Sequence, residues 1–435
     1  MKAGITSFLF ILSAYLTTAQ TWQLLPNSPT AALVNDDIYF VNENKGWLVN
    51  LNGYIFKTED GGITFDTLLI QPGTAFRSLG FIDSLHGFAG NLGPGSWISG
   101  VTDTIPLYET IDGGNSWQPV TNINITGQYP KGICGINVVN DTLIYAVGRY
   151  AGPPVFLKTI DGGQTWNSTD CSAFAGLLID VHFFSPDTGI VVGGNDSGYA
   201  AVFYTVNGGM TWQQVALHSH FPSYHWKISF PSRNIGYVTV SSAGSTNQII
   251  KTTDGGLTWQ NFSLPAPANA DFTGIGFIND SVGWAGAWSP GVNYVTYDGG
   301  NTWSPFTLDP AFNRFRKIND TTAFICGERV WKYTTQSVGI SEIPNQYTGY
   351  MLKQNFPNPF TENTFIEYSI PESGLVELVL FDGGGRTLKT LVNQSQSKGT
   401  YTVEINLPYK YNTLFYCKLS VNGFKKIIQM VMLKQ

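Results

Sequence analysis

The chain is poor in charged residues, and this scarcity excludes several classes of function. Only 12% of its 435 residues are charged, the net charge is -6, and the basic residues form no cluster beyond the pair Lys425 and Lys426. Proteins that bind nucleic acid need a basic face for the phosphates, so nucleic acid is excluded as the main partner. The sequence has no P-loop, dinucleotide fingerprint or Ser/His/Asp signature, and the glycine run at 383–385 has no helix behind it to hold a phosphate. We therefore predict no cofactor.

Cysteine is also scarce. The four cysteines, Cys134, Cys171, Cys326 and Cys417, lack the C-x-x-C spacing of zinc and redox motifs. Cys134 and Cys171 flank one expected repeat unit and would pair in an oxidising compartment. The alternative is four buried free thiols, because cysteine packs readily as a small apolar residue.

Long apolar runs are absent except at the N-terminus. Lys2 supplies a positive charge, residues 5–16 form a short apolar run, and small residues at 17–19 precede a cleavage position near Gln20. This order is typical of a secretory signal peptide, which we place at residues 1–19. The apolar run is too short to span a bilayer comfortably. We therefore expect an exported mature protein without a membrane span.

Glycine and aromatic residues are plentiful, and many of them belong to one repeated octapeptide. Six copies of Thr-x-Asp-Gly-Gly-x-Thr-Trp, with small variations, begin at positions 58, 110, 159, 205, 252 and 296, separated by 44 to 52 residues. A period of this size, with short strand-like runs inside each unit, predicts one four-stranded sheet per repeat, as in the blade of a β-propeller.

The octapeptide residues suit a hairpin turn and need no substrate to explain them. The Asp or Asn side chain accepts hydrogen bonds from backbone N–H groups, and the Gly pair permits positive φ. The closing Trp is expected to pack between sheets. The predicted structural residues are Asp60, Asp112, Asp161, Asn207, Asp254, Asp298, Trp117, Trp166, Trp212, Trp259 and Trp303.

The number of blades follows from the two ends of the repeat region. Six complete units cover residues 36–308, and a seventh begins at Phe312 but lacks both the octapeptide and a fourth strand. The Thr-Trp-Gln sequence at Trp22 matches the residues that follow the octapeptide turn elsewhere, so this segment is expected to pair with the strand around Trp331. We therefore predict an all-β fold with a seven-bladed propeller over residues 20–337, closed by the N-terminal strand. The alternative is a six-bladed ring with an extra hairpin.

The pattern changes after the repeats. Residues 338–350 are polar and indicate a linker. Six alternating strands are then expected at 364–370, 376–381, 387–392, 400–407, 414–421 and 424–433, separated by Gly- and Asn-rich turns. Short strands at this spacing predict a small immunoglobulin-like sandwich over residues 351–435.

This last segment resembles the type A C-terminal sorting domain of the type IX secretion system. The resemblance rests on the Asn-Phe-Pro-Asn-Pro-Phe motif at 355–360, the glycine turn at 382–386, Gly-Thr-Tyr at 399–401 and the closing basic strand; one departure is Leu-Phe-Tyr at 414–416, where the family has Gly-x-Tyr. It implies export through the type IX machinery as a partner, followed by release or anchoring at the cell surface. The motif residues are Asn355, Pro357, Asn358, Pro359, Phe360, Asp382, Gly383, Lys425 and Lys426.

The repeats have a resemblance of their own. The octapeptides resemble Asp-box repeats of bacterial neuraminidases. Together with an upstream aromatic–turn–Gly-aromatic signature, as at Phe81 to Phe88, they look most like the photosystem II assembly-factor propellers and their secreted relatives. The Asp-box is shared by sialidases, xyloglucan-cleaving hydrolases, sortilin-type receptors and non-enzymes. It therefore implies a fold element and not an activity.

A sialidase or another glycosidase would need charged residues in the propeller channel. A sialidase needs three arginines, but no Phe-Arg-Ile-Pro-like motif precedes the first octapeptide, and only Arg77 and Arg316 are expected to face the channel. Other glycosidases need two carboxylates across a cleft. Asp36, Asp180 and Asp271 lie near the starts of expected inner strands, and the favoured alternative is that they are solvated strand-end carboxylates.

One segment combines histidine with aromatic residues. His218, His220 and His225 lie together, but no carboxylate or cysteine completes a metal site, so we expect a surface loop and no metal. Tyr224 and Trp226 would serve either as a stacking platform for a sugar or peptide or as ordinary core packing.

These observations favour a secreted, non-catalytic propeller that binds a glycan or protein ligand through loops at one face. The alternative is an exported glycoside hydrolase on the same scaffold. The candidate binding residues of the channel or face are Arg77, Asp180, Trp226, Asp271 and Arg316.

Overall fold

The computed structural model describes residues 19–30, 34–148, 152–242, 248–267, 270–289, 291–308, 312–336, 349–382, 387–407 and 413–432. Residues 1–18 of the expected signal peptide, most of the expected linker and Gly383 lie outside this part. The chain divides into a larger unit, Gln20–Thr335, and a smaller unit that contains Gln336–Gln435. Strands are the only regular elements in the described residues, and none of these residues forms a helix that could cross a membrane.

The first half of the larger unit forms three sheets and the start of a fourth. The strands are β2 (Asn35–Phe40), β3 (Gly46–Asn50), β4 (Tyr54–Thr58), β5 (Asp66–Ile70), β6 (Phe76–Phe81), β7 (Gly87–Asn91), β8 (Leu107–Thr110), β9 (Gln118–Pro119), β10 (Ile123–Thr126), β11 (Gly135–Val138), β12 (Ile144–Gly148), β13 (Val155–Thr159), β14 (Trp166–Asp170), β15 (Ala175–Phe183) and β16 (Gly189–Asn195).

The second half continues in the same way. Its strands are β17 (Ala200–Thr205), β18 (Gln213–Leu217), β19 (Ser223–Ser229), β20 (Gly236–Ser242), β21 (Gln248–Thr252), β22 (Gln260–Ser263), β23 (Asp271–Phe277), β24 (Gly283–Ser289), β25 (Val292–Thr296), β26 (Ser304–Phe306), β27 (Phe312–Lys317), β28 (Thr322–Gly327) and β29 (Val330–Gln336), together with β1 (Ala19–Leu24).

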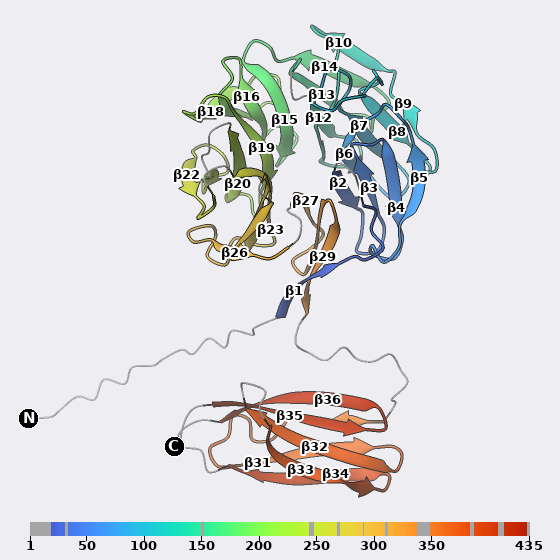
Figure 1. Cartoon of the computed structure of the whole chain (residues 1–435), viewed down its shortest axis with the longest axis vertical. Coiled ribbons are helices and arrows are strands. Elements are labelled where there is room, and N and C mark those ends of the chain that lie inside the picture. The colour runs from blue at the N-terminus through green and yellow to red at the C-terminus, as the bar shows by residue number, and fades with distance from the viewer. Residues whose placement is uncertain are drawn as a thin grey trace, which may run out of the picture. The chain divides into compact units, whose positions relative to one another are not determined.

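Within the described residues, these strands form seven sheets arranged around one centre (Figure 1). Five sheets are β2-β3-β4-β5, β6-β7-β8-β9, β15-β16-β17-β18, β19-β20-β21-β22 and β23-β24-β25-β26; the other two are β10-β14-β13-β12-β11 and β1-β29-β28-β27. The strands β2, β6, β11, β15, β19, β23 and β27 each contact the next in this order, and β27 contacts β2. The described first strands therefore form a closed inner circle.

The N-terminal strand completes the last sheet. β1 lies beside β29, and the Leu25 amide donates a hydrogen bond of 3.0 Å to the Val330 carbonyl. The Trp22 ring packs against the rings of Trp284 and Tyr333, with centroids 5.2 and 5.3 Å away. The expected pairing of this segment with the strand around Trp331 is therefore confirmed.

Every octapeptide forms the same hydrogen-bonded turn. In the third copy, Asp161 accepts bonds from the Thr165 amide at 2.9 Å and the Thr165 hydroxyl at 2.6 Å, while Thr159 donates to Asp161 at 2.7 Å. Gly163 has a φ of 97°, and a Cβ there would lie 2.3 Å from the Phe88 ring. The turn thus requires glycine for both its backbone conformation and its close approach to the neighbouring sheet.

Three closing tryptophans pack against an aromatic residue from the upstream signature of the same unit. Trp117 meets Phe81, Trp259 meets Phe230 and Trp303 meets Phe277, each edge-on, with centroids 6.0 to 6.2 Å apart. Trp166 instead meets Phe88 of the preceding unit. Trp117, Trp166 and Trp303 are buried, whereas Trp212 and Trp259 are half-buried. The octapeptide and the upstream signature therefore form one packing unit in the second, fifth and sixth copies.

The turn hydrogen bonds predict a loss of stability in acid. Hydrogen bonds from Thr64 and Thr165 lower the pKa of Asp60 and Asp161 from 3.8 to about 2. A carboxylate whose pKa is depressed by folding stabilises the fold above its unfolded pKa and loses this contribution as the pH falls through its folded pKa. We expect the melting temperature of the larger unit to fall between about pH 4 and pH 2.

A matched variant isolates this effect. In the fourth copy Asn207 replaces the aspartate and makes the same bond from the Thr211 amide, at 2.9 Å, while its own amide donates to the Thr211 hydroxyl. Asparagine in all five aspartate positions should therefore keep the turns at neutral pH and flatten the acid dependence. An acid transition that is identical in the wild type and this variant would contradict the assignment.

The smaller unit has two described sheets, β30-β31-β34 and β33-β32-β35-β36. Its strands are β30 (Met351–Leu352), β31 (Asn363–Ile370), β32 (Gly374–Asp382), β33 (Thr387–Gln396), β34 (Gly399–Asn406), β35 (Thr413–Val421) and β36 (Phe424–Met432). Six of them lie at the expected runs, and β30 was not expected. Both sheets contribute to one buried core, which includes Ile366 and Tyr368 from one sheet and Leu378 and Leu419 from the other.

The cysteines are free and buried in both units. Cys134, Cys171 and Cys326 lie in the larger unit and Cys417 in the smaller one. The pairing of Cys134 with Cys171 is therefore wrong, and the alternative of buried thiols holds. Burial raises the pKa of Cys171 to about 12, because the thiolate would lose its solvation.

Candidate functional site

Six of the seven inner strands carry a β-bulge near their first residues. The extra residues are Asp36 in β2, Arg77 in β6, Gly176 and Ile179 in β15, one residue of the pair Trp226–Lys227 in β19, Thr273 in β23 and Asn313 in β27. A bulge disrupts the alternation of side chains and redirects them locally. Consecutive polar residues on these strands can therefore both reach the centre of the ring.

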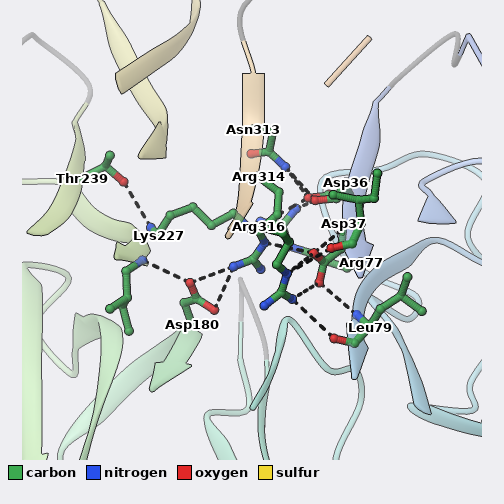
Figure 2. A network of polar contacts seen from close by, with 12 residues as sticks. Asp36, Asp37, Arg77, Leu79, Asp180, Lys227, Thr239, Asn313, Arg314 and Arg316 are labelled. Carbon is green, nitrogen blue, oxygen red and sulfur yellow. Dashed lines mark hydrogen bonds and ion pairs between the residues drawn. The ribbon is translucent and has the colours of Figure 1, made fainter. Parts of the chain in front are cut away.

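The bulged strands bring charged residues together in what we call the channel network (Figure 2). It consists of Asp36, Asp37, Arg77, Asp180, Lys227, Asn313, Arg314 and Arg316. These residues come from five of the seven sheets, so the network connects sheets that are far apart in the sequence.

Asp36 is at one side of the network. Arg77 donates to its Oδ2 atom, and the side-chain amide of Asn313 donates to its Oδ1 atom. The Lys227 ammonium lies 3.9 Å from Asp36 Oδ1. Asp36 is buried, and it is already held by two cationic groups and an amide.

Asp37 and Asp180 share one arginine. Arg314 lies 3.3 Å from Asp37 through Nε and 3.1 Å from Asp180 through Nη1. Arg316 adds a contact of 2.8 Å to Asp37. Burial acts to raise the pKa of Asp37, but the two arginines outweigh it, so the pKa lies below its usual value and Asp37 is ionised.

Lys227 is a buried ammonium with few protein partners. Its surroundings lower its pKa to about 7, first through desolvation and then through repulsion by Arg314 and Arg77. Desolvation disfavours the charged form of a base, and like charges act in the same direction. Lys227 is therefore the channel-network group that titrates nearest neutral pH.

A cavity of about 250 Å³ lies beside Asp36 and Arg77. Aromatic side chains form much of its wall, and Trp97 and Trp288, which are 47% and 43% exposed, lie where it meets solvent. The lining residues come from the beginnings of inner strands and from the ends of the strands beside them. They are Val34, Asp36, Leu51, Arg77, Trp97, Tyr224, Trp226, Ser241, Asp271, Thr273, Trp288 and Asn313.

Several polar atoms in the cavity wall have no protein hydrogen-bond partner among the described residues. They are Nε and Nη2 of Arg77, Oδ1 of Asp271 and Oγ1 of Thr273. Arg77 is 1% exposed and Thr273 is 6% exposed. Burial raises the pKa of Asp271. A buried polar group without a partner is unfavourable, and such groups in a cavity indicate a place for water or a ligand.

The channel residues predicted from the sequence lie in the cavity wall, in the channel network or, for Arg77, in both. Arg77, Trp226 and Asp271 line the cavity, and the Arg77 guanidinium lies 4.9 Å from the Trp226 ring centroid. Asp180 and Arg316 belong to the channel network and do not line the cavity.

The sequence favoured solvated carboxylates at the strand ends, and this interpretation is wrong for Asp36 and Asp180. Both are buried, because the bulges turn them toward the arginines at the centre instead of toward solvent. Asp271 is only partly buried.

Sequence reasoning did not select Asp37, Lys227, Asn313 or Arg314. Simple alternation that places Asp36 and Asn313 on the inner face of their strands places the next residues, Asp37 and Arg314, on the opposite face. The available signal was two adjacent polar residues near the start of an inner strand, in Asp36–Asp37 and in Asn313–Arg314.

The expectation of a surface loop for the histidines is wrong for two of them. His218 and His225 are buried, since His225 belongs to β19 and His218 directly follows β18. His218 Nε2 lies 2.8 Å from the Gln248 side-chain oxygen, and burial lowers the pKa of His225 to about 3. No three metal-ligating residues gather anywhere in the described part of the chain.

The motif at the start of the smaller unit lies against its last strand. Asn358 accepts a hydrogen bond of 2.8 Å from the Val431 amide, and the Phe360 amide donates to the Val431 carbonyl. Asn355 is buried and donates to Thr364. Lys425 is exposed and Lys426 half-buried on β36. The motif and the closing strand, far apart in sequence, therefore form one structural feature.

The fold of the larger unit is that of a β-propeller, and comparisons with known proteins agree. No family model matches the chain. It is 27% identical over 302 residues to the photosystem II assembly lipoprotein Ycf48 of Synechococcus sp. (strain CC9902), across 67% of this chain and 82% of that protein.

Two solved structures illustrate the likeness. Ycf48 bound to a D1 peptide has a TM-score of 0.54 and 18% identity, and the match covers 73% of this chain and 96% of that one. The GH74 xyloglucanase from Xanthomonas campestris has a TM-score of 0.52 and 11% identity, over 94% of this chain and 68% of that one. At these identities the structures show the propeller fold and not a shared activity.

Proposed function

We propose that this protein is an exported, seven-bladed propeller that binds a ligand at the cavity without cleaving it. The proposal rests on how few carboxylates line the cavity and on how they are paired. The lining of the cavity holds only Asp36 and Asp271 as carboxylates among the described residues, and Asp36 is already paired with Arg77. A glycosidase needs two carboxyl groups, one on each side of the scissile bond, and one of the two is here committed to an ion pair.

The seven sheets support the count of seven blades. Five run in sequence order from the inner strand outward, a sixth runs from β11 to β14 with β10 added at its outer edge, and the seventh combines β27, β28 and β29 with β1 from the N-terminus. Closure by strands from the two ends of the chain protects the edge of β29 from pairing with other molecules. The turns at the octapeptides act as Asp-box elements that fix the outer part of six of the seven blades.

Export is supported by the two ends of the sequence. The N-terminal residues 1–19 have the order of a signal peptide. The two-sheet core of the smaller unit is consistent with an immunoglobulin-like type IX sorting domain, in which Asn358 and Phe360 bind the closing strand. We propose that this unit directs passage through the outer membrane, after which the propeller is released or held at the cell surface.

A binding role also agrees with the relative found by sequence. The matched relative is named an assembly protein, and a propeller of that name has been solved with a peptide bound. For the present chain the ligand is a protein segment or a glycan presented outside the cell.

Hydrolysis assays test the proposal. The purified full-length chain should bind a ligand from a combined glycan and peptide array yet release no product from chromogenic glycosides or polysaccharides. We expect Asp271→Asn to leave the hydrolysis signal at the level of a buffer blank, as in the wild type. Turnover by the wild type that disappears in Asp271→Asn would overturn the non-catalytic assignment.

A further inference from the structure

The inference concerns which ligand the cavity takes, and it rests on the proposed function. The cavity measures about 250 Å³, which is below the roughly 300–1,000 Å³ of pockets for drug-sized ligands. It therefore accommodates about one ring or one side chain. Trp97 and Trp288 line it while remaining partly exposed, so flat apolar surfaces are available at its mouth.

The unpaired atoms in the wall require a ligand that both donates and accepts hydrogen bonds. Nε and Nη2 of Arg77 can only donate, Oδ1 of Asp271 serves as an acceptor, and the Thr273 hydroxyl can do either. A cationic group would satisfy Asp271 but leave the Arg77 donors unpaired and face a like charge. An anionic group would pair with the Arg77 donors but would leave Asp271 unpaired and face a like charge there. Hydroxyl groups meet both demands.

We propose that the cavity binds a neutral sugar ring of a glycan. The ring stacks on Trp97 or Trp288, and its hydroxyl groups bond to Arg77, Thr273 and Asp271. An extended peptide fits less well, because it would need a row of backbone partners along a groove, whereas the unpaired groups gather in one compact hollow.

The test measures binding of the full-length chain to neutral gluco-, galacto-, manno- and xylo-oligosaccharides by calorimetry. Sialylated and uronic-acid oligosaccharides and synthetic peptides are run alongside. We expect at least one neutral oligosaccharide to bind, and the double variant Trp97→Ala/Trp288→Ala and the single variant Thr273→Val each to weaken its binding roughly tenfold or more. The matched controls are Tyr297→Ala, an exposed aromatic at an octapeptide turn, and Thr67→Val on β5, which should bind as the wild type does.

Each outcome is decisive. Binding of neutral sugars that both cavity variants lose and both controls keep supports the inference. Binding of acidic sugars or peptides alone, binding unaffected by the cavity variants, or no binding overturns it. Binding of peptides alone overturns the sugar site but leaves the proposed binding function intact. Cleavage of a bound oligosaccharide overturns the non-catalytic function but still supports a sugar site in the cavity. Thermal melting of each variant confirms that a loss of binding is not a loss of fold.

Discussion

Replacing Arg314 by methionine is expected to lower the free energy of unfolding of the propeller by about 3–5 kcal/mol, among the largest effects of any single substitution. Arg314 is buried and contacts both Asp37 and Asp180. Its removal leaves Asp180 without a cationic contact at hydrogen-bond distance and Asp37 with Arg316 alone. Removing one member of a buried ion pair is costly because the remaining charge keeps its desolvation penalty.

Denaturant unfolding followed by tryptophan fluorescence measures this loss directly. All 12 tryptophans lie between positions 22 and 331, so the fluorescence reports the propeller and not the smaller unit. The matched control is Lys317→Met on the same strand, whose ion pair with Asp320 is at the surface and is expected to change the stability far less, because solvent screens exposed ion pairs. The double variant Arg314→Met/Asp180→Asn should recover part of the loss, since it removes the stranded charge. Equal destabilisation by Arg314→Met and Lys317→Met would refute this account.

The repeat architecture was open to prediction because it depends on local chemistry. The Gly pair, the Asp or Asn and the closing Trp of each octapeptide act within eight residues, and Thr165 bonds to Asp161 four positions away. The same holds for the six strands of the smaller unit, which alternate cleanly and are separated by turns. The pairing of β1 with β29 was also predictable, since the Thr-Trp-Gln sequence at Trp22 recurs at the turns of Thr211 and Thr258.

The channel network was only partly predictable, for two physical reasons. Its partners are brought together by ring closure, as with Asn313 and Asp36, which are 277 positions apart. Its residues also lie at bulges, where one extra residue breaks the period of two on which strand prediction depends. A pattern that assigns Asp36 inward assigns Asp37 outward, yet both side chains bind arginines in the channel. Arg77 and Asp180 were found because strand beginnings point to a channel, and not because their partners were visible.

Deleting residues 19–25 is the second change with a large expected effect, because it removes the outer strand of the last sheet. Trp22 packs against Trp284 and Tyr333, and the buried Leu25 lies in a core cluster with Phe324. Loss of the half-buried Trp22, the buried Leu25 and the β1 pairing together suggests a decrease of more than about 5 kcal/mol in the free energy of unfolding. The deletion also exposes the edge of β29, so the truncated chain should self-associate as its concentration rises.

Two further measurements separate packing from edge protection. Trp22→Ala should lower the free energy of unfolding by about 3 kcal/mol while the chain remains monomeric, because β1 still covers β29. A synthetic peptide of residues 19–28, added to the truncated chain, should raise its melting temperature and suppress association, both measured by light scattering during a thermal scan. A truncated chain that melts like the wild type and stays monomeric would show that the ring closes without β1. Because the proposed signal-peptide cleavage near Gln20 lies at the beginning of this strand, the same experiment tests whether processing leaves enough of β1 to complete the last blade.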